Sequence, residues 1–164
     1  MKVAIFGGSF DPPHLGHSSV VLQLLERGVD EVLVIPCFEH TEKKNSLPFW
    51  RRHALCVQAF GSYPNVTVSI VEQKLQGASS SLRTVQHLQE AHPEWEMSFV
   101  LGEDLRESSK LWPGWSDLER IAPPVFFPRS TVSSYLIRAA KEEGRLEDVR
   151  RYVTKDVYRL LEAF

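Results

Sequence analysis

The sequence is poor in cysteine and has no long hydrophobic run, and each shortage excludes a class of protein. Its two cysteines, Cys37 and Cys56, lack metal-ligand spacing and cannot form a disulfide framework. We therefore expect two small buried side chains and a reducing, cytoplasmic setting. The apolar runs fall short of the ~20 residues that span a membrane, and the stretch before Gly7 is too short for a signal peptide.

An excess of basic charge is also absent. Lysine and arginine total 19 against 21 acidic residues, a net charge of −2. This balance gives no electrostatic footprint for nucleic acid and no polybasic membrane patch, so any anion must be bound locally. The length of 164 residues, with 43% hydrophobic and 24% charged residues, predicts one folded domain over 1–164.

Apolar runs typical of buried strands alternate with segments of helical spacing. The expected strands are 3–6, 31–36, 66–71, 97–101 and 124–128. The expected helices are 16–28, 48–60, 81–92 with Ser81 as cap, 103–110, 116–121, 134–143 and 155–162. This alternation predicts an α/β fold: a Rossmann-like doubly wound parallel sheet with a small C-terminal helical segment. The loops that follow the first, second, fourth and fifth strands should share one rim, where such sheets bind ligands.

The stretch GGSFDPPHLGH, residues 7–17, directly follows the first expected strand. Gly7 and Gly8 let backbone N–H groups approach a ligand, and His14 and His17 lie three apart at the start of a helix. With the positive helix end, these groups predict a cradle for phosphate. The stretch matches neither GxGxxG nor a P-loop. Two other interpretations stay open: a zinc site, for which no third ligand lies nearby, and a tight turn capped by Asp11.

The same eleven residues resemble the signature GG[ST]FDPxHxGH of the HxGH nucleotidyltransferase superfamily, most closely that of bacterial nicotinate mononucleotide adenylyltransferases. The resemblance implies that the backbone at Gly8, Ser9 and Phe10 and the rings of His14 and His17 hold ATP while its α-phosphate is attacked. Phosphopantetheine adenylyltransferases usually have threonine in place of the first histidine.

A second segment, VSSYLIR at 132–138, resembles the family element ISSTxIR. By resemblance Ser133 and Ser134 bind the triphosphate and Arg138 pairs with its oxygens, a task that suits the guanidinium fork. Taken alone, the segment favours a serine-capped helix with a surface arginine. Two departures stand out: Tyr135 replaces the family's threonine, and the stretch between Arg129 and this element is shorter than in nicotinate mononucleotide adenylyltransferases.

Two further segments extend the resemblance along the chain. FVLGEDL is similar to the family's FxxGxD, which implies that Gly102 and Asp104 contact the adenosine or the ribose of the nucleotide. SSSLRTV is similar to SYTxxTL, which implies that Ser81 and Thr84 lie near the pyridine ring of the acceptor.

WPGW resembles the site of the tryptophan that stacks on the pyridine ring of the acceptor in this family. Trp115 matches best because the apolar helix LERIA follows it, and Trp112 is the competitor. Tryptophan suits ring stacking through its large face. Both side chains are equally open to interpretation as half-buried packing residues.

The loop 37–47 carries basic residues, as this family often does. Lys43 is expected to bind ATP, Lys44 to neutralise the leaving pyrophosphate during catalysis, and His40 lies beside them. A solvated charge run explains the same residues.

The resemblance implies an enzyme that transfers AMP from ATP to nicotinate mononucleotide and releases pyrophosphate, with Mg²⁺ held through the ATP phosphates and no metal bound by protein residues. Transfer of AMP or CMP to another phosphate monoester, such as phosphopantetheine, is one alternative. A nucleotide-binding regulatory module without turnover is another. Nucleic acid and membrane are not expected partners, and assembly into a homo-oligomer stays open.

Overall fold

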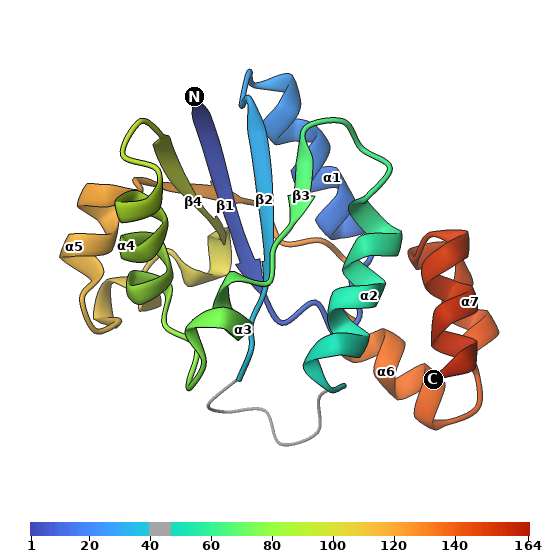
Figure 1. Cartoon of the computed structure of the whole chain (residues 1–164). Helices are drawn as coiled ribbons and strands as arrows, with labels where there is room; N and C mark the ends of the chain where they lie inside the picture. The colour runs from blue at the N-terminus through green and yellow to red at the C-terminus, as the bar shows by residue number, and fades with distance from the viewer. Residues whose placement is uncertain (40–46) are drawn as a thin grey trace.

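A five-stranded parallel sheet forms the centre of the molecule, in a computed structural model that describes residues 1–39 and 47–164 (Figure 1). The strand order is β3-β2-β1-β4-β5, and each neighbouring pair is parallel. This order confirms the predicted doubly wound sheet, because the chain winds outward from β1 in one direction and then resumes at β4 on its other side. The strands are β1 (Lys2–Gly8), β2 (Glu31–Pro36), β3 (Val66–Val68), β4 (Glu96–Gly102) and β5 (Pro124–Phe127).

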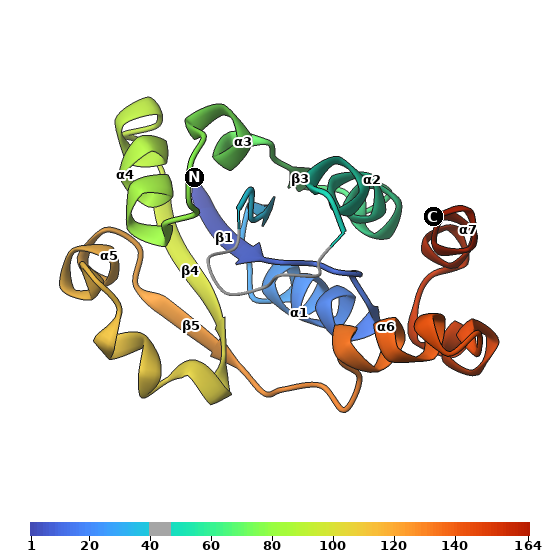
Figure 2. The ribbon, with the colours of Figure 1, turned by 90° about the horizontal axis from the view of Figure 1, so that it is seen from below.

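Helices cover both faces of the sheet, with α4 and α5 on one side and α1 and α6 on the other in the view from its lower end (Figure 2). The α-helices are α1 (Leu15–Glu26), α2 (Phe49–Phe60), α3 (Val71–Leu75), α4 (Ser81–Ala91), α5 (Trp115–Ile121), α6 (Ser134–Glu142) and α7 (Lys155–Ala163). Three 3₁₀ helices join them: η1 (Glu103–Leu105), η2 (Ser108–Leu111) and η3 (Leu146–Tyr152).

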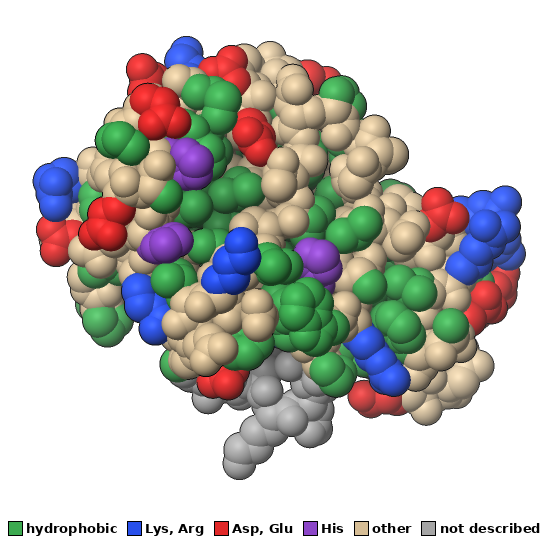
Figure 3. Space-filling model, in the orientation of Figure 1, with side chains coloured by type: hydrophobic (Ala, Val, Ile, Leu, Met, Phe, Trp, Pro, Cys, Tyr) green, Lys and Arg blue, Asp and Glu red, His purple; other side chains and the backbone are tan. Residues whose placement is uncertain are grey.

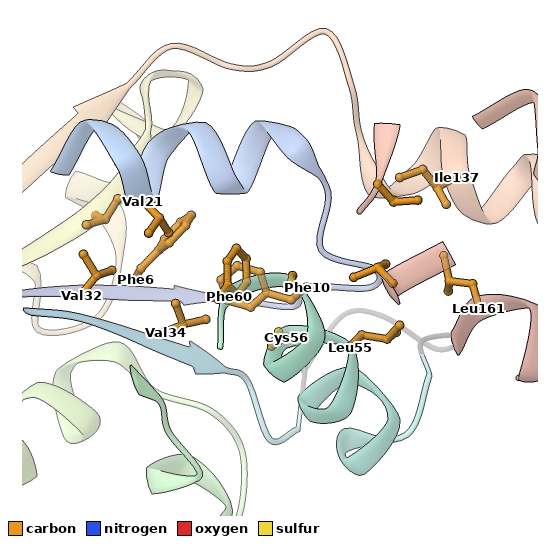
Figure 4. Close-up of a cluster of buried hydrophobic side chains, with 14 of the residues drawn as sticks. Phe6, Phe10, Val21, Val32, Val34, Leu55, Cys56, Phe60, Ile137 and Leu161 are labelled. Atoms are coloured by element: carbon orange, nitrogen blue, oxygen red, sulfur yellow. The ribbon is translucent and has the colours of Figure 1, made fainter. Parts of the chain in front are cut away.

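Alternation along the strands divides the buried side chains into two core clusters. In β1, Ala4 and Phe6 join a cluster with α1, α2, α6 and α7, whereas Val3 and Ile5 join a second cluster with α3, α4 and α5. Side chains of successive strand residues point to opposite faces, so a fully buried strand must be apolar throughout. Figure 4 shows part of the first cluster, in which Phe6 lies between α1 and the sheet.

Several element boundaries differ from the sequence expectation. The expected strand 66–71 ends at Val68, the last residue in register with β2, and the backbone N–H of Val71, the first residue of α3, donates to the hydroxyl of Ser69. The expected helix 103–110 is two 3₁₀ turns, each closed by an ion pair three residues apart. The cap of α4 is Ser80 rather than Ser81, since the Ser80 hydroxyl accepts from the N–H of Arg83.

The C-terminal helical segment is confirmed, and η3 adds a turn that the sequence pattern did not indicate. Lys141 on α6 donates to the carbonyl of Leu161 on α7, which ties this segment together. Cys37 and Cys56 are free and buried, as expected. Among the helices in the described ranges, none has both the length and the apolar character needed to cross a membrane.

Candidate active site

A cleft of about 440 Å³ opens at the carboxyl ends of β1, β4 and β5. Because β1 and β4 are where the winding direction reverses, the cleft occupies the switch point at which doubly wound sheets bind ligands. Its walls come from β1, α1, β4, β5 and α6. The lining residues used below are Gly16, Gly102, Arg129, Ser130, Tyr135 and Arg138, together with His14, His17, Ser133 and Ser134.

The two histidines form a reciprocal cap at the start of α1. His14 is the N-cap residue, and its Nδ1 accepts from the backbone N–H of Gly16 at 3.2 Å. The Nδ1 of His17 in turn accepts from the backbone N–H of His14 at 3.1 Å. The rings stack with centroids 3.8 Å apart, and His17 also packs against Phe10 at 5.0 Å. These contacts hold both rings in one orientation beside the cleft.

This capping determines where each imidazole carries its proton. Since both Nδ1 atoms accept hydrogen bonds, each neutral ring is protonated at Nε2 and presents a single N–H donor there. Burial lowers the pKa of His14 from 6.5 to about 4. Burial, with a further contribution from the nearby His14, lowers the pKa of His17 to about 3. Both side chains are therefore neutral hydrogen-bond donors near pH 7.

The segment that follows β5 docks against this capped helix. A Cβ on Gly16 would lie 2.6 Å from the Cβ of Ser130, so the close approach requires glycine at position 16. The hydroxyl of Ser134 donates to the carbonyl of Pro12 at 2.8 Å. Ser133 is the N-cap of α6, where its hydroxyl accepts from the N–H of Leu136. The two conspicuous motifs, far apart in sequence, thus pack directly against each other and together line one cleft.

Arg138 lines the cleft and is anchored through the first motif. Its guanidinium donates to the backbone carbonyl of Asp11 at 2.6 Å, and the Asp11 carboxylate lies 3.9 Å away. Asp11 is buried, and its carboxylate also accepts from the backbone N–H of Leu47. The Arg138 side chain is 28% exposed and lines the cleft, and its guanidinium has further N–H donors beyond the one bonded to Asp11.

Asp104 and Arg129 form an ion pair at the ends of β4 and β5, with 2.7 Å between Oδ2 and the guanidinium nitrogen. Arg129 and Gly102 line the cleft, whereas Asp104 is outside its lining. The Tyr135 ring lies at the cleft with 69% exposure. Sequence reasoning assigned no role to Arg129. Its position directly after a predicted strand was the available signal, because strand ends share one rim.

The glycine-rich loop supports the cleft without lining it. Gly7, Gly8, Ser9 and Phe10 are all outside the lining residues. The Phe10 side chain is 2% exposed and packs edge-on against Phe6 and Phe60, so it holds His17 in place from the core side. Only its backbone remains for ligand contact.

The residues expected to hold the acceptor lie on the α4–α5 side and do not line the cleft. Thr84 is 3% exposed and its hydroxyl donates to Glu72, while Ser81 is half-buried in the first turn of α4. Trp115 is 9% exposed within the second core cluster, and its ring meets the half-buried Trp112 edge-on.

The remaining candidates from the sequence are the basic residues of the loop 37–47 and possible metal ligands. His40, Lys43 and Lys44 lie outside the described residues. Within the described ranges, no group of three histidine, cysteine or carboxylate side chains is placed to hold a metal ion. A cation that arrives on substrate phosphates fits this donor set, because Mg²⁺ is commonly bound through substrate oxygens and water. On the face in Figure 3, basic and acidic side chains are interspersed.

Known proteins resemble this chain over nearly its whole length. Residues 5–143 match the family described as Cytidylyltransferase-like. A protein of Anaeromyxobacter dehalogenans named as a probable nicotinate-nucleotide adenylyltransferase is 32% identical, over 99% of this chain and 94% of that protein. A relative of the same name from Thermotoga maritima is 30% identical, over 90% of this chain and 72% of its own length.

Solved structures share the fold. A Vibrio parahaemolyticus structure, titled as a nicotinate-nucleotide adenylyltransferase, superposes with a TM-score of 0.83 at 29% identity and covers 98% of each chain. The Plasmodium falciparum nicotinic acid mononucleotide adenylyltransferase has a TM-score of 0.80 at 17% identity, over 99% of this chain and 95% of that one, which speaks to the fold alone. The match across 5–143, the sheet order and the capped histidines agree: this chain belongs to the cytidylyltransferase-like family of nucleotidyltransferases.

Proposed function

We propose that this protein transfers AMP from ATP to nicotinate mononucleotide, forming nicotinate adenine dinucleotide and pyrophosphate. A phosphate oxygen of the acceptor attacks the α-phosphorus of ATP, and the bond from that phosphorus to the oxygen bridging to the β-phosphorus breaks. No residue needs to form a covalent intermediate, because the acceptor phosphate is itself the nucleophile. Catalysis then rests on positioning and on stabilising negative charge.

The observation that carries this proposal is the pair of Nε2–H donors beside the cleft. Neutral donors held rigidly by helix capping need little reorganisation as charge grows on the phosphoryl oxygens. His14 and His17 contact the α-phosphate in this scheme. Arg138 on α6 and Ser133 at its N-cap contact the β- and γ-phosphates in this scheme. A planar cation and a hydroxyl suit the phosphate oxygens.

Mg²⁺ enters as part of the Mg·ATP substrate and offsets charge on the leaving pyrophosphate. No protein cage for it is required, which fits the scarcity of carboxylates on the cleft wall. Lys43 and Lys44 remain candidates for contacts to the triphosphate. Gly102 and Asp104, at the end of β4, remain candidates for the ribose.

The test is pyrophosphate release from Mg·ATP with a panel of phosphate monoesters: nicotinate mononucleotide, its amide, phosphopantetheine and simple sugar phosphates. We expect selective turnover with nicotinate mononucleotide. Faster turnover with phosphopantetheine or another ester would move the acceptor assignment within the family. Measurable ATP binding with no turnover on any acceptor would favour the regulatory module.

A further inference from the structure

A buried carboxylate outside the cleft joins the loop after β2 to the start of α4. Glu72, on α3, is 8% exposed. Its Oε2 accepts from the backbone N–H of Phe38 at 3.0 Å and from the hydroxyl of Ser79, and its Oε1 accepts from the hydroxyl of Thr84 at 3.2 Å. Three donors from two separate segments thus converge on one side chain. The three hydrogen bonds that this carboxylate accepts offset the cost of burying it, and the N–H of Phe38 also donates to the hydroxyl oxygen of Ser79 at 3.0 Å.

The segment after β2 receives a second clamp from a buried arginine. Arg52, on α2, is 3% exposed, and its guanidinium donates to the carbonyls of Cys37 at 2.7 Å and Phe38 at 3.4 Å. The same guanidinium donates to the carbonyl of Ser9 at 2.8 Å. The loop after β2 is therefore held from α2 and from α3, and one of these clamps also holds the glycine-rich loop.

Phe38 is the residue that the two clamps share. Arg52 binds its carbonyl and Glu72 binds its N–H, so a continuous chain of hydrogen bonds runs from Ser9 to Thr84. A backbone bond from the N–H of Ser79 to the carbonyl of Glu39 runs parallel to it. This series of hydrogen bonds extends from the glycine-rich loop to the first turn of α4.

We propose that Glu72 is a positioning residue for the acceptor: it sets the distance between the glycine-rich loop and the start of α4 without touching substrate. The inference rests on the proposed function and on the expectation that Ser81, in the first turn of α4, lies near the acceptor. A near-attack geometry tolerates little displacement, so loosening the start of α4 should weaken acceptor binding while leaving the ATP cleft intact.

The substitutions Glu72→Ala and Glu72→Gln separate positioning from folding. Alanine leaves the hydroxyls of Ser79 and Thr84 without their acceptor and leaves the N–H of Phe38 with only the Ser79 hydroxyl oxygen at 3.0 Å, whereas glutamine keeps one oxygen for Phe38 and Ser79, and its NH₂ can donate to a reoriented Thr84 hydroxyl. We expect Glu72→Ala to raise the acceptor KM about tenfold with less than about twofold change in the KM for ATP. Glu72→Gln should recover most of the loss.

Leu88→Ala is the matched control. Leu88 is buried in the second core cluster on α4, so its truncation lowers the thermal stability of the same side without removing a hydrogen bond to Glu72. If Leu88→Ala raises the acceptor KM as much as Glu72→Ala at equal loss of Tm, or if Glu72→Ala raises both KM values together, Glu72 is only structural and the inference fails.

Amide hydrogen exchange provides a readout that needs no acceptor. In Glu72→Ala, the amide of Phe38 keeps only the Ser79 hydroxyl oxygen, which itself loses its partner at Glu72. This amide should therefore exchange at least about tenfold faster, while amides of α1 keep their wild-type protection. Unchanged protection at Phe38 would overturn the inference even if the enzyme is active. Absence of turnover with nicotinate mononucleotide in the wild-type protein would instead overturn the proposed acceptor. The failure of the inference and the failure of the proposed function are therefore distinguishable.

Discussion

The proposed nucleotide side and the proposed acceptor side of the site are built differently. On the nucleotide side, His14, His17 and Arg138 line an open cleft and are held in place by backbone contacts. On the acceptor side, Thr84 and Trp115 are buried at 3% and 9% exposure and bond or pack inward. The proposed nucleotide side is thus held by the histidine cap and by the contact of Arg138 with Asp11, whereas the proposed acceptor side depends on contacts among α3, α4 and α5. Substitutions on the two sides should separate these roles.

The largest effect is expected from substitutions of His17. Asparagine and glutamine at this position separate its capping function from its function as a hydrogen-bond donor. His17→Asn places an oxygen near Nδ1 and retains the cap but removes the Nε2–H donor, so kcat should fall about 10²-fold or more with little change in Tm. His17→Gln places an NH₂ near Nε2 and loses the cap, so it should retain more activity and melt at a lower temperature. Equal kcat for the two variants would argue against the donor role.

Arg138→Lys tests the proposed contact between α6 and the ATP phosphates. Lysine keeps the charge but loses the planar fork and the hydrogen bond to the carbonyl of Asp11, so kcat/KM for ATP should fall about tenfold. Steady-state kinetics with ATP varied at saturating acceptor gives this value. A change confined to the acceptor KM would indicate that Arg138 contacts the acceptor rather than ATP.

The tryptophans test the acceptor side. Trp115→Ala should raise the acceptor KM about fivefold, more than that of ATP, and should also lower Tm because the ring belongs to a core cluster. Trp112→Ala, on a half-buried ring, should leave Tm nearly unchanged. If Trp112→Ala raises the acceptor KM more, the stacking role belongs to Trp112.

A smaller effect is expected at Tyr135, the departure from the family pattern. Its ring is 69% exposed at the cleft, so Tyr135→Thr should change kcat/KM for ATP by less than about threefold. Tyr135→Phe serves as the control that retains the ring. A gain of tenfold or more in the threonine variant would show that tyrosine disturbs triphosphate binding.

No protonation of the two histidines is expected between pH 8 and pH 5.5, because their pKa values lie at about 4 and about 3. In the unfolded chain both would take up protons near 6.5, so their effect is to lower stability progressively as pH falls from about 6.5 toward 4. Nitrogen-15 NMR of the rings should show protonated Nε2 and bare Nδ1 throughout. A titration midpoint near 6.5 for either ring would contradict the capped geometry.

Much of the nucleotide side was predictable because its signals are local or belong to one motif. The alternation of apolar runs predicted the sheet and its crossover helices, and the spacing of His14 and His17 predicted that both rings share one turn. The contacts of Arg138 with Asp11 were not predictable, since the two residues lie 127 positions apart and meet only through the sheet order.

The acceptor side shows the opposite balance. Resemblance indicated Thr84, yet its hydroxyl bonds to Glu72, which carried no signal in the sequence. The boundary of the expected strand 66–71 was wrong for a similar reason: an apolar residue such as Val71 fits a strand and a buried helix equally well. Only the pairing with β2 decided between them.

The sequence by itself determined the alternation of strands and helices, the family and the position of His14 and His17 on one helical turn, because these depend on periodicity and on residues close together in the chain. Only the tertiary structure decided which side chains face the cleft and which support it. That choice rests on contacts between segments far apart in the chain, such as Gly16 with Ser130 and Glu72 with Phe38, whose distances are set by how the helices pack on the sheet.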